Sequence, residues 1–378
     1  MMNKIIIFTN FFKPGFKAGG PIKSIELMCK YLTNDFEILV ITSAYDKDSD
    51  KAYANIEPDK ILKKDGYKII YLSSYSLSCI LSNIKKFSPN LIYLNSIFSI
   101  QNILILLSNK FIKLPKIILS PRGEISLNTL KIKEFKKKIA IFIFKFFNLF
   151  HGIDFHATSK FESEYILKIF PKNKVTIISN FTSSFKKSLK KYKKKNKIKM
   201  CFVSRITQKK NLKYAIQILS NKKLNNIEIS FDIWGPIEDE KYWRECMKHI
   251  SDLPKNIQVK YMGLFSPANQ VKLLSFYELL FLPTLNENFG HVIYESMQLG
   301  IVPLISDNTL WASINNYGGG SFSLQNKDKF INYLLEFSKL DNKKFSKISK
   351  KIIQYAYSNN DNLINKKKYK SFFNEKSK

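Results

Sequence analysis

The sequence of 378 residues lacks the signals that mark disulfide-rich, metal-binding or membrane-spanning proteins. Its four cysteines are scattered and form no Cys-x-x-Cys pair, so neither a zinc site nor a disulfide framework is indicated. The four histidines show no His-Glu-x-x-His spacing, and we predict no metal site. The early apolar run Ile5–Phe8 is too short for a signal peptide, and no run approaches the ~18 apolar residues of a transmembrane helix. We therefore expect a protein of the reducing cytoplasm.

Arginine is scarce even though the chain is strongly basic. Only Arg122, Arg205 and Arg244 occur, so lysine supplies almost all of the net charge of +32. Specific base readout and bidentate phosphate contacts favour arginine. The lysine-rich composition is therefore more typical of compositional bias than of nucleic-acid binding, and we expect no nucleic-acid partner. The charge still favours anionic surfaces, including lipid headgroups.

The chain is long enough for two domains, and its 45% apolar content is sufficient for sizeable cores. Apolar runs of strand length alternate with helical stretches, which indicates α/β domains with parallel sheets and helices on both faces. A lysine-rich run at 186–199 interrupts this alternation and is interpreted as a solvated linker. We predict a first domain over 1–185 and a second over 200–359. The segment 360–378 is a candidate for completing the first domain.

The stretch Leu282–Ser306 carries the strongest functional signal. It contains two carboxylates, Glu287 before an expected helix start and Glu295 one to two turns inside the helix, between two apolar runs of strand length. In parallel sheets such loops lie at the carboxyl ends of the strands, where ligands bind. Free N–H groups and the helix dipole attract a phosphate there. The residues of this expected phosphate site are Asn288, Phe289, Gly290 and His291.

The two carboxylates suit different parts of a phosphorylated ligand. Glu287 lies before the helix, so we expect it to reach a hydroxyl-rich group beside the phosphate. Glu295 is expected to accept hydrogen bonds from a ribose diol, as acidic residues do in other nucleotide-binding folds. Gly290 lets the backbone approach the ligand closely because it carries no side chain.

Cations follow the first strand of the second predicted domain. Arg205 and Lys210 lie in a loop between this strand and a helix, where they can hold both phosphates of a diphosphate. Negative charge grows on a diphosphate as it leaves, so fixed cations aimed at it would lower the barrier of the reaction.

Two weaker signals follow strands of the first predicted domain. Gly19 and Gly20 allow the backbone to pass close to a sugar phosphate, and Pro21 suits the first helical position. Arg122 lies in the segment Ser-Pro-Arg-Gly, where a solvated turn and a binding role are both open.

Together these segments resemble the retaining glycosyltransferases of family 4, in the GT-B class (glycosyl transferases group 1). The likeness lies in the Glu-x7-Glu unit, the Ser-Arg-(x)4-Lys loop, the glycine loop and Ser-Pro-Arg-Gly. The family usually has glycine where this chain has Asn211, a residue that also tolerates unusual backbone angles. The resemblance implies two Rossmann-like, doubly wound domains that face a central cleft, the first on the acceptor side and the second binding the nucleotide-sugar.

The resemblance also implies an activity, that of an enzyme of the hexosyltransferase class. It would move a sugar from a nucleotide-diphosphate sugar to a glycan or lipid-linked acceptor, with retention of configuration, without a metal and without a cofactor. In a bacterium it would build surface polysaccharide, such as lipopolysaccharide or capsule, as a peripheral protein on the inner face of the cytoplasmic membrane. The implied catalytic residues are Glu287, Arg205, Lys210 and Arg122, and the implied donor-binding residues are Gly19, Gly20, Asn288, Phe289, Gly290, His291 and Glu295.

Two other functions remain open at this point. A sugar-nucleotide epimerase of the GT-B fold would convert the donor without any acceptor. A non-catalytic polyanion-binding protein would depend on the net charge of +32 alone. The run Asp46-Lys-Asp48 resembles the metal site of GT-A transferases, but it lies in a lysine-rich polar loop and the rest of the chain favours the other class.

The segment 131–150 combines lysines with many Ile and Phe residues, and two interpretations of it stand side by side. A basic amphipathic helix can lie on an anionic membrane. A core helix with a solvated lysine edge fits the same pattern.

Overall fold

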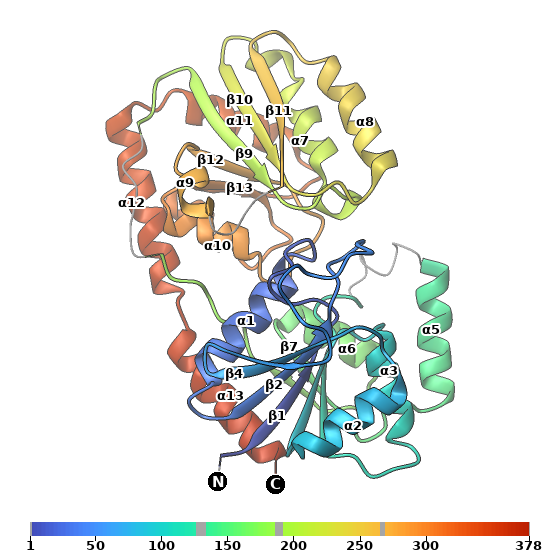
Figure 1. The fold of residues 1–378 in the computed structure, drawn as a ribbon. Helices are drawn as coiled ribbons and strands as arrows, with labels where there is room; N and C mark the ends of the chain where they lie inside the picture. The colour runs from blue at the N-terminus through green and yellow to red at the C-terminus, as the bar shows by residue number, and fades with distance from the viewer. Residues whose placement is uncertain (1, 126–133, 186–191, 265–268, 378) are drawn as a thin grey trace. The chain divides into compact units, whose positions relative to one another are not determined.

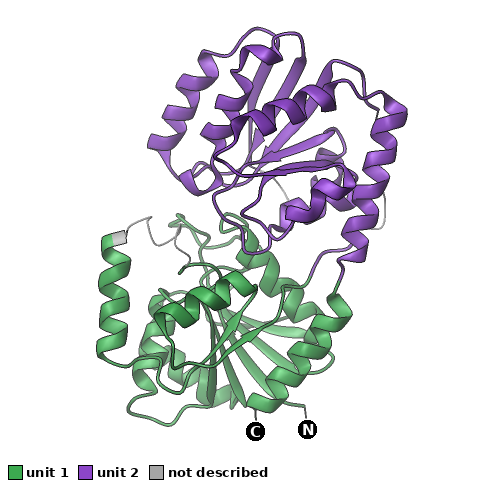
Figure 2. Ribbon diagram, turned by 180° about the vertical axis from the view of Figure 1, so that it is seen from behind, with its two compact units in different colours: residues 1–181, 361–378 green, residues 182–360 purple. Residues whose placement is uncertain are grey.

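The computed structural model describes residues 2–125, 134–185, 192–264 and 269–377 (Figure 1). The chain divides into two compact units (Figure 2). Unit 1 comprises residues 1–181 and 361–378, and unit 2 comprises residues 182–360. The C-terminal segment, a candidate from the sequence for completing the first domain, thus belongs to unit 1.

Unit 1 is built on an eight-stranded sheet of order β3-β4-β2-β1-β5-β6-β7-β8. All neighbours pair in parallel except β3, which pairs with β4 in antiparallel fashion at one edge. All four residues of β3 are exposed. The strand therefore needs no apolar pattern, and its sequence does not predict it. The strands are β1 (Lys4–Phe8), β2 (Glu37–Ser43), β3 (Ile61–Lys64), β4 (Tyr67–Leu72), β5 (Leu91–Asn95), β6 (Lys116–Ser120), β7 (Asp154–Ala157) and β8 (Val175–Ile177).

The alternating side chains of β1 show how helices cover both faces of this sheet. Ile5 and Ile7 join the core under α1 (Gly20–Leu32) and α13 (Asn362–Lys376). Ile6 and Phe8 point the other way, into the core on the second face. That face is covered by α2 (Leu77–Phe87), α3 (Ile100–Ser108), α5 (Glu134–Phe146) and α6 (Lys160–Ile169).

Unit 2 has a six-stranded, parallel sheet of order β11-β10-β9-β12-β13-β14. Its strands are β9 (Lys197–Val203), β10 (Glu228–Trp234), β11 (Ile257–Gly263), β12 (Leu279–Leu282), β13 (Val302–Ser306) and β14 (Gly320–Phe322). Its helices include α7 (Leu212–Leu219), α8 (Glu240–Ser251), α9 (Gln270–Leu274), α10 (His291–Gln298), α11 (Lys327–Ser338) and α12 (Asn342–Ser358). The predicted class of two doubly wound α/β domains is confirmed.

The predicted linker 186–199 lies inside unit 2, which begins at residue 182, and its last three residues belong to a strand. Lys197, Ile198 and Lys199 open β9, where the isoleucine is buried and the two lysines are exposed. Long lysine stems can lie along a sheet while their charges stay in water, so a lysine-rich run does not exclude a strand. Lys193, also within the predicted linker, is fully buried and its Nζ donates to the carbonyl of Lys194 at 2.6 Å. Residues 186–191 of the linker lie outside the described residues.

Candidate active site

Three loops of unit 2 follow neighbouring strands at their carboxyl ends. The loop after β9 carries Arg205 and Lys210, the loop after β12 carries Glu287, and the loop after β10 carries Glu238. These strands are adjacent in the sheet, and the sequence order of the strands reverses between β9 and β12. In open α/β sheets, ligands bind outside the carboxyl ends at such a switch point. The strongest sequence signals therefore lie where this fold binds its ligands.

The β10 loop lies directly against the β9 loop. Gly235 has a φ of 135°, and a Cβ at this position would stand 1.9 Å from the carbonyl oxygen of Ser204, so only glycine fits. The close approach brings Glu238 to Arg205, whose Nη1 donates to both carboxylate oxygens at 3.1 and 3.0 Å. These bonds use one of three guanidinium nitrogens, and the guanidinium fork has further N–H donors for a ligand.

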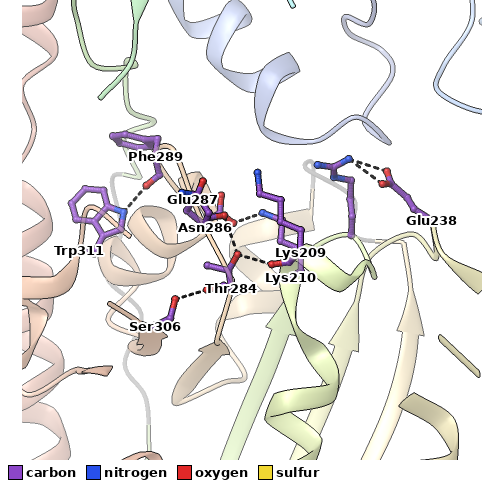
Figure 3. Close-up of polar contacts among 10 residues, drawn as sticks. Lys209, Lys210, Glu238, Thr284, Asn286, Glu287, Phe289, Ser306 and Trp311 are labelled. Atoms are coloured by element: carbon purple, nitrogen blue, oxygen red, sulfur yellow. Dashed lines mark hydrogen bonds and ion pairs between the residues drawn. The ribbon is translucent and has the colours of Figure 1, made fainter. Parts of the chain in front are cut away.

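The β12 loop is tied to the same β9 loop (Figure 3). The carbonyl of Lys209 accepts hydrogen bonds from Leu285 N at 2.9 Å and from Thr284 Oγ1 at 3.1 Å. This connection sets Lys210 Nζ against the carboxylate of Glu287 in an ion pair. Their side chains are only 11% and 13% exposed, so the pair is largely shielded from water. The structure thus brings together two residues that are far apart in the sequence.

Asn211 shows how the β9 loop ends without the glycine of the related motif. The residue follows a 3-10 turn over Gln208–Lys210 and has φ 60° and ψ 39°. This left-handed conformation suits glycine, and asparagine adopts it more readily than most residues. Helix α7 begins at the next residue, so Asn211 makes the same turn from loop to helix.

The start of α10 is held in place by a tryptophan. Gly290 is the N-cap of α10 with a φ of 74°, and a Cβ there would lie 2.9 Å from Ile293 Cδ1. The indole N–H of Trp311 donates to the carbonyl of Phe289 at 2.6 Å, and the two rings meet edge to face at 5.4 Å (Figure 3). Because the first N–H groups of a helix have no partner within the helix, this fixed end of α10, starting at His291, suits an anion.

Glu295 lies one turn inside α10 and is buried, with 5% exposure. Its Oε1 accepts a hydrogen bond from the Ser183 hydroxyl at 2.7 Å, and its Oε2 accepts one from the Gln270 amide. A carboxylate has about four lone-pair sites, so these two bonds orient Glu295 and leave it able to accept more. The predicted ribose contact stays a prediction.

The glycine loop lies in unit 1. Gly19 has a φ of 71° and is the N-cap of α1, and Pro21 stands within the first two positions of that helix. The Oδ2 of Asp46 accepts from the backbone N–H groups of Phe16 and Lys17 at 3.2 and 3.5 Å. Asp46 therefore shapes the segment that precedes Gly19 and Gly20, a structural role that differs from the metal-binding interpretation of the run Asp46-Lys-Asp48.

Arg122 also lies in unit 1, at the end of β6, and its guanidinium is engaged by three neutral groups. Nε donates to Asn95 Oδ1 at 2.9 Å, Nη1 to Asn180 Oδ1 at 2.6 Å and Nη2 to the Tyr93 hydroxyl at 3.0 Å. Each nitrogen of the fork thus already donates once inside unit 1. The guanidinium joins the end of β5 to the end of β6 and to residue 180, and its predicted contact with a substrate stays a prediction.

The Arg122 network continues to a buried histidine. His156 Nε2 lies 2.9 Å from the carbonyl of Ile178, which can only accept, so this nitrogen carries the proton. Nδ1 then accepts from the Tyr93 hydroxyl at 2.6 Å. Burial, with the Arg122 charge as a second cause, lowers the pKa of His156 to about 3. The imidazole is therefore neutral at physiological pH and holds Tyr93 in place.

Three residues of unit 2 that position the predicted site give only faint signals in the sequence. Glu238 pairs with Arg205, Thr284 joins two loops, and Trp311 fixes the start of α10. A Gly-Pro step after a buried strand, at Gly235, signals a tight turn and points to Glu238 as a side chain at the carboxyl edge. Trp311 lies in Thr309-Leu-Trp311, which resembles a Thr-Pro-Trp stretch of the related family but does not indicate a contact with Phe289. Thr284 gives no signal, because its contacts depend on loops that only the folded sheet brings together.

The described residues hold neither a metal-ligand cluster nor a membrane-spanning helix. Across 2–125, 134–185, 192–264 and 269–377, no three His, Cys, Asp or Glu side chains gather as metal ligands. Over the same ranges, the helices are all too short or too polar to cross a membrane.

Unit 2 resembles a known protein family. Residues 184–359 match the family model described as Glycosyl transferases group 1. No curated protein matches the sequence significantly.

Solved structures resemble the whole chain. Sucrose-phosphate synthase from Thermosynechococcus elongatus has a TM-score of 0.76 at 12% identity, covering 99% of this chain and 98% of that one. HepE from Anabaena, in complex with UDP and glucose, has a TM-score of 0.70 at 14% identity, covering 99% and 100%. A glycosyltransferase from Rickettsia africae has a TM-score of 0.71 at 15% identity, covering 100% and 99%. A further HepE structure contains UDP-glucose.

At these low identities, the structural likeness shows the fold alone, which is GT-B. The family match and the fold together define a glycosyltransferase, so the chain is an enzyme of that class. The resemblance that the sequence motifs indicated is confirmed at this level.

Proposed function

We propose that the protein is a retaining, metal-independent glycosyltransferase of family 4 with a nucleotide-diphosphate sugar as donor. The observation that carries the proposal is the convergence of Arg205, Lys210 and Glu287 at the β9/β12 switch point. All three lie within the residues that match the family model. The UDP-glucose in HepE supports a donor of the same chemical class.

The ion pairs of the site suit a diphosphate that enters and leaves. Arg205 and Lys210 are each bound to a single carboxylate, Glu238 and Glu287 respectively. A diphosphate carries more charge than a carboxylate and offers more acceptor oxygens, so it competes for both cations. The start of α10 adds N–H donors at Gly290 and His291. In this proposal Asn288 and Phe289 shape that turn, and Glu295 binds the ribose.

The chemistry follows from charge development on the diphosphate. The bond between the anomeric carbon and the β-phosphate oxygen breaks, and the acceptor oxygen forms a new bond to the same face of that carbon. The acceptor proton passes to the departing diphosphate, so no carboxylate base is required. Arg205 and Lys210 stabilise the negative charge as it grows. Glu287, held by Lys210, orients the sugar hydroxyls.

For the acceptor, we propose the strand ends of unit 1, which the polar network of Arg122 holds in place. The contact of Gly19 and Gly20 with the donor stays a prediction. The acceptor would be a glycan or a lipid-linked glycan of a bacterial surface polysaccharide, such as lipopolysaccharide or capsule. The enzyme would then work as a peripheral protein at the inner face of the cytoplasmic membrane, which the net charge of +32 supports.

The first test pairs two arginine variants. Arg205→Met removes a cation of the site, whereas Arg244→Met removes an exposed arginine of α8 whose Nε bonds to the carbonyl of Glu240. A panel of nucleotide-sugars is added to each protein, and thermal stabilisation and sugar transfer are measured. We expect a ligand that stabilises the wild type and Arg244→Met but stabilises Arg205→Met at least tenfold less tightly. Equal stabilisation of all three would contradict the diphosphate site.

Three experiments test the finer claims. The anomeric configuration of the product, followed by NMR from donor to product, should be retained. Full activity in the presence of a chelator would support metal independence, and loss that manganese restores would contradict it. Donor incubated without acceptor should yield at most slow hydrolysis, since an epimerised donor would identify an isomerase instead.

A further inference from the structure

Helix α5 turns an apolar face away from the body of unit 1. Phe135, Phe142 and Phe146 are 77%, 70% and 74% exposed. With Ile139, they recur at spacings of three and four residues, which puts them in one stripe along the helix. Ile143 and Phe147, also exposed, widen the stripe on one side. Soluble surfaces rarely leave so many large apolar side chains together, so this stripe marks an interaction surface.

The opposite side of α5 fixes the helix to the protein. Phe144 is buried in the core of unit 1 and packs against Phe150 with ring centroids 5.4 Å apart. Lys137 lies on this inner side, with its Nζ 5.6 Å from the ring centroid of Phe98. Because the inner side is already packed, the outer stripe cannot become core by a rotation of the helix. The core interpretation of the segment therefore holds for one side only. Lys131 and Lys133, which belong to the predicted segment, lie outside the described residues.

Lysines border the outer stripe. With 100° between successive residues, Lys138 and Lys145 share one border of the stripe, and Lys136 lies near the other. From Phe135 to Ile153 the sequence has no acidic residue. Figure 1 shows α5 at the outer edge of unit 1, beyond α3. An apolar stripe between two lysine borders is the pattern of a helix that lies in a membrane interface, with the lysine stems reaching up to the headgroups.

The neighbouring turn extends the surface. Lys110 Nζ donates to the carbonyl of Asn148 at 2.7 Å, which fixes the end of α3 beside the end of α5. Phe111, the next residue, is 88% exposed, and Ile112 is also exposed. Lys113 adds another cation within the same turn. Aromatic and cationic side chains thus continue past the last turn of α5.

We propose that the outer stripe of α5 (Phe135, Ile139, Phe142, Ile143, Phe146 and Phe147) inserts into the interface of an anionic lipid bilayer, with Lys136, Lys138 and Lys145 binding the headgroups. The occupant is lipid because the stripe combines apolar bulk with charges that are all positive after Glu134, the first residue of the helix, and acidic headgroups supply the matching charge. The proposal names the surface for the peripheral membrane association proposed above, but it does not depend on the activity of unit 2.

The test is flotation of the full chain with vesicles, first of phosphatidylcholine and then with about one third phosphatidylglycerol. The wild type should bind the acidic vesicles. Phe142→Ser/Phe146→Ser should weaken this binding roughly tenfold or more, because two phenyl groups no longer leave water. The control Leu363→Ser/Ile364→Ser removes exposed apolar residues from α13 and should bind as the wild type does.

Two double-lysine variants measure the electrostatic contribution to vesicle binding separately from the apolar one. Lys138→Gln/Lys145→Gln should lose several-fold affinity at low salt and little at high salt, whereas Lys350→Gln/Lys351→Gln on α12 should change nothing. Equal vesicle binding by the phenylalanine pair and the wild type would overturn the proposal. So would a wild type that ignores acidic vesicles but self-associates through the same phenylalanines. Turnover of a soluble donor, measured in parallel, reports on unit 2 and leaves the vesicle result independent of the proposed activity.

Discussion

The two units share a parallel sheet plan but hold their strand-end arginines in different ways. In unit 2, Arg205 is one-third exposed and paired with the carboxylate of Glu238. In unit 1, Arg122 donates to two amides and a phenol. A cation paired with a carboxylate can exchange that partner for a phosphate with little change in charge balance. A guanidinium held by neutral groups cannot leave them without depriving their buried oxygen atoms of a hydrogen-bond donor. An arginine after a strand can therefore exchange its partner for a ligand in unit 2, whereas in unit 1 it holds neighbouring strand ends together.

The largest expected effect lies in unit 2, at the pair of Lys210 and Glu287. Lys210→Met removes a cation from the departing diphosphate, and sugar transfer should fall about 10²- to 10³-fold, as for the loss of other preorganised groups that stabilise developing charge. It also leaves Glu287 without its partner, which should lower stability by about 3–5 kcal/mol because the carboxylate is largely buried. Steady-state kinetics and chemical denaturation measure the two losses separately.

A double variant sharpens this prediction. Lys210→Met/Glu287→Gln removes both charges, so stability should recover most of the loss while sugar transfer stays low. If transfer recovered together with stability, the lysine would be only a structural partner of Glu287, and the comparison between the units would fail.

Arg122 should behave in the opposite manner. Arg122→Met leaves the oxygens of Asn95, Asn180 and Tyr93 without their donor, and each such loss costs about 1–3 kcal/mol when the group is buried. We expect unit 1 to lose at least about 3 kcal/mol of stability, measured by urea denaturation. Arg205→Met should change stability by less than about 1 kcal/mol, since its ion pair is partly exposed. A stable Arg122→Met protein with impaired acceptor binding would instead assign Arg122 to the substrate.

The pH dependence of stability should also separate the units. His156 in unit 1 has a pKa lowered to about 3, whereas a histidine in an unfolded chain has a pKa of about 6.5. In this pH range the unfolded chain binds a proton at His156 that the native state does not bind. The free energy of unfolding of unit 1 should therefore fall by up to about 1.4 kcal/mol per pH unit as the pH falls below about 6.5 toward 3. Between pH 6.5 and 5, before most carboxylates titrate, the expected loss is about 2 kcal/mol.

Tryptophan provides the readout, because Trp234, Trp243 and Trp311 all lie in unit 2. Circular dichroism follows both units, so acid should produce a loss of dichroism before tryptophan emission changes. The variant His156→Gln cannot take up this proton and should show a flatter profile between pH 6.5 and 5. The same slope in both proteins would mean that another group causes the acid response.

The fold was predictable from the sequence because its strands are buried on both faces. Runs such as Ile5–Phe8 and Leu279–Leu282 are apolar throughout, as strands covered by two helical layers must be. Segments without this pattern give no strand signal in the sequence. β3 is exposed at an edge, and the start of β9 alternates lysine with isoleucine. Local pattern therefore identifies central strands better than edges and strand ends.

The site was predictable where one loop carries its own signal, and less so where two loops meet. Glu287 and Lys210 could each be named as candidates, but nothing local indicates that they pair. Their contact depends on Thr284, Leu285 and Lys209, which join the loops only because β9 and β12 are neighbours. The contacts of Glu238 with Arg205 and of Trp311 with Phe289 likewise depend on sheet order. Sequence reasoning reaches these contacts only after the strand order is known.

The smallest expected effect concerns how the C-terminal helix is attached to unit 1. Asp35 lies against Lys366 and Lys370 of α13 at 3.0 and 2.7 Å, and these lysines, Lys370 first, lower the pKa of its carboxyl. These ion pairs of Asp35 add to the stability of the fold above the usual pKa of an aspartate. Their contribution is lost as the pH falls below that value. Because both lysines reach solvent, Asp35→Asn should cost no more than about 1 kcal/mol at pH 7, and added salt should reduce the difference. Phe372 and Phe373 of α13 are buried, so apolar contact holds the helix. Urea denaturation of both proteins at low and high salt measures the difference, and a cost well above 1 kcal/mol that salt leaves unchanged would show that charge attaches α13 instead.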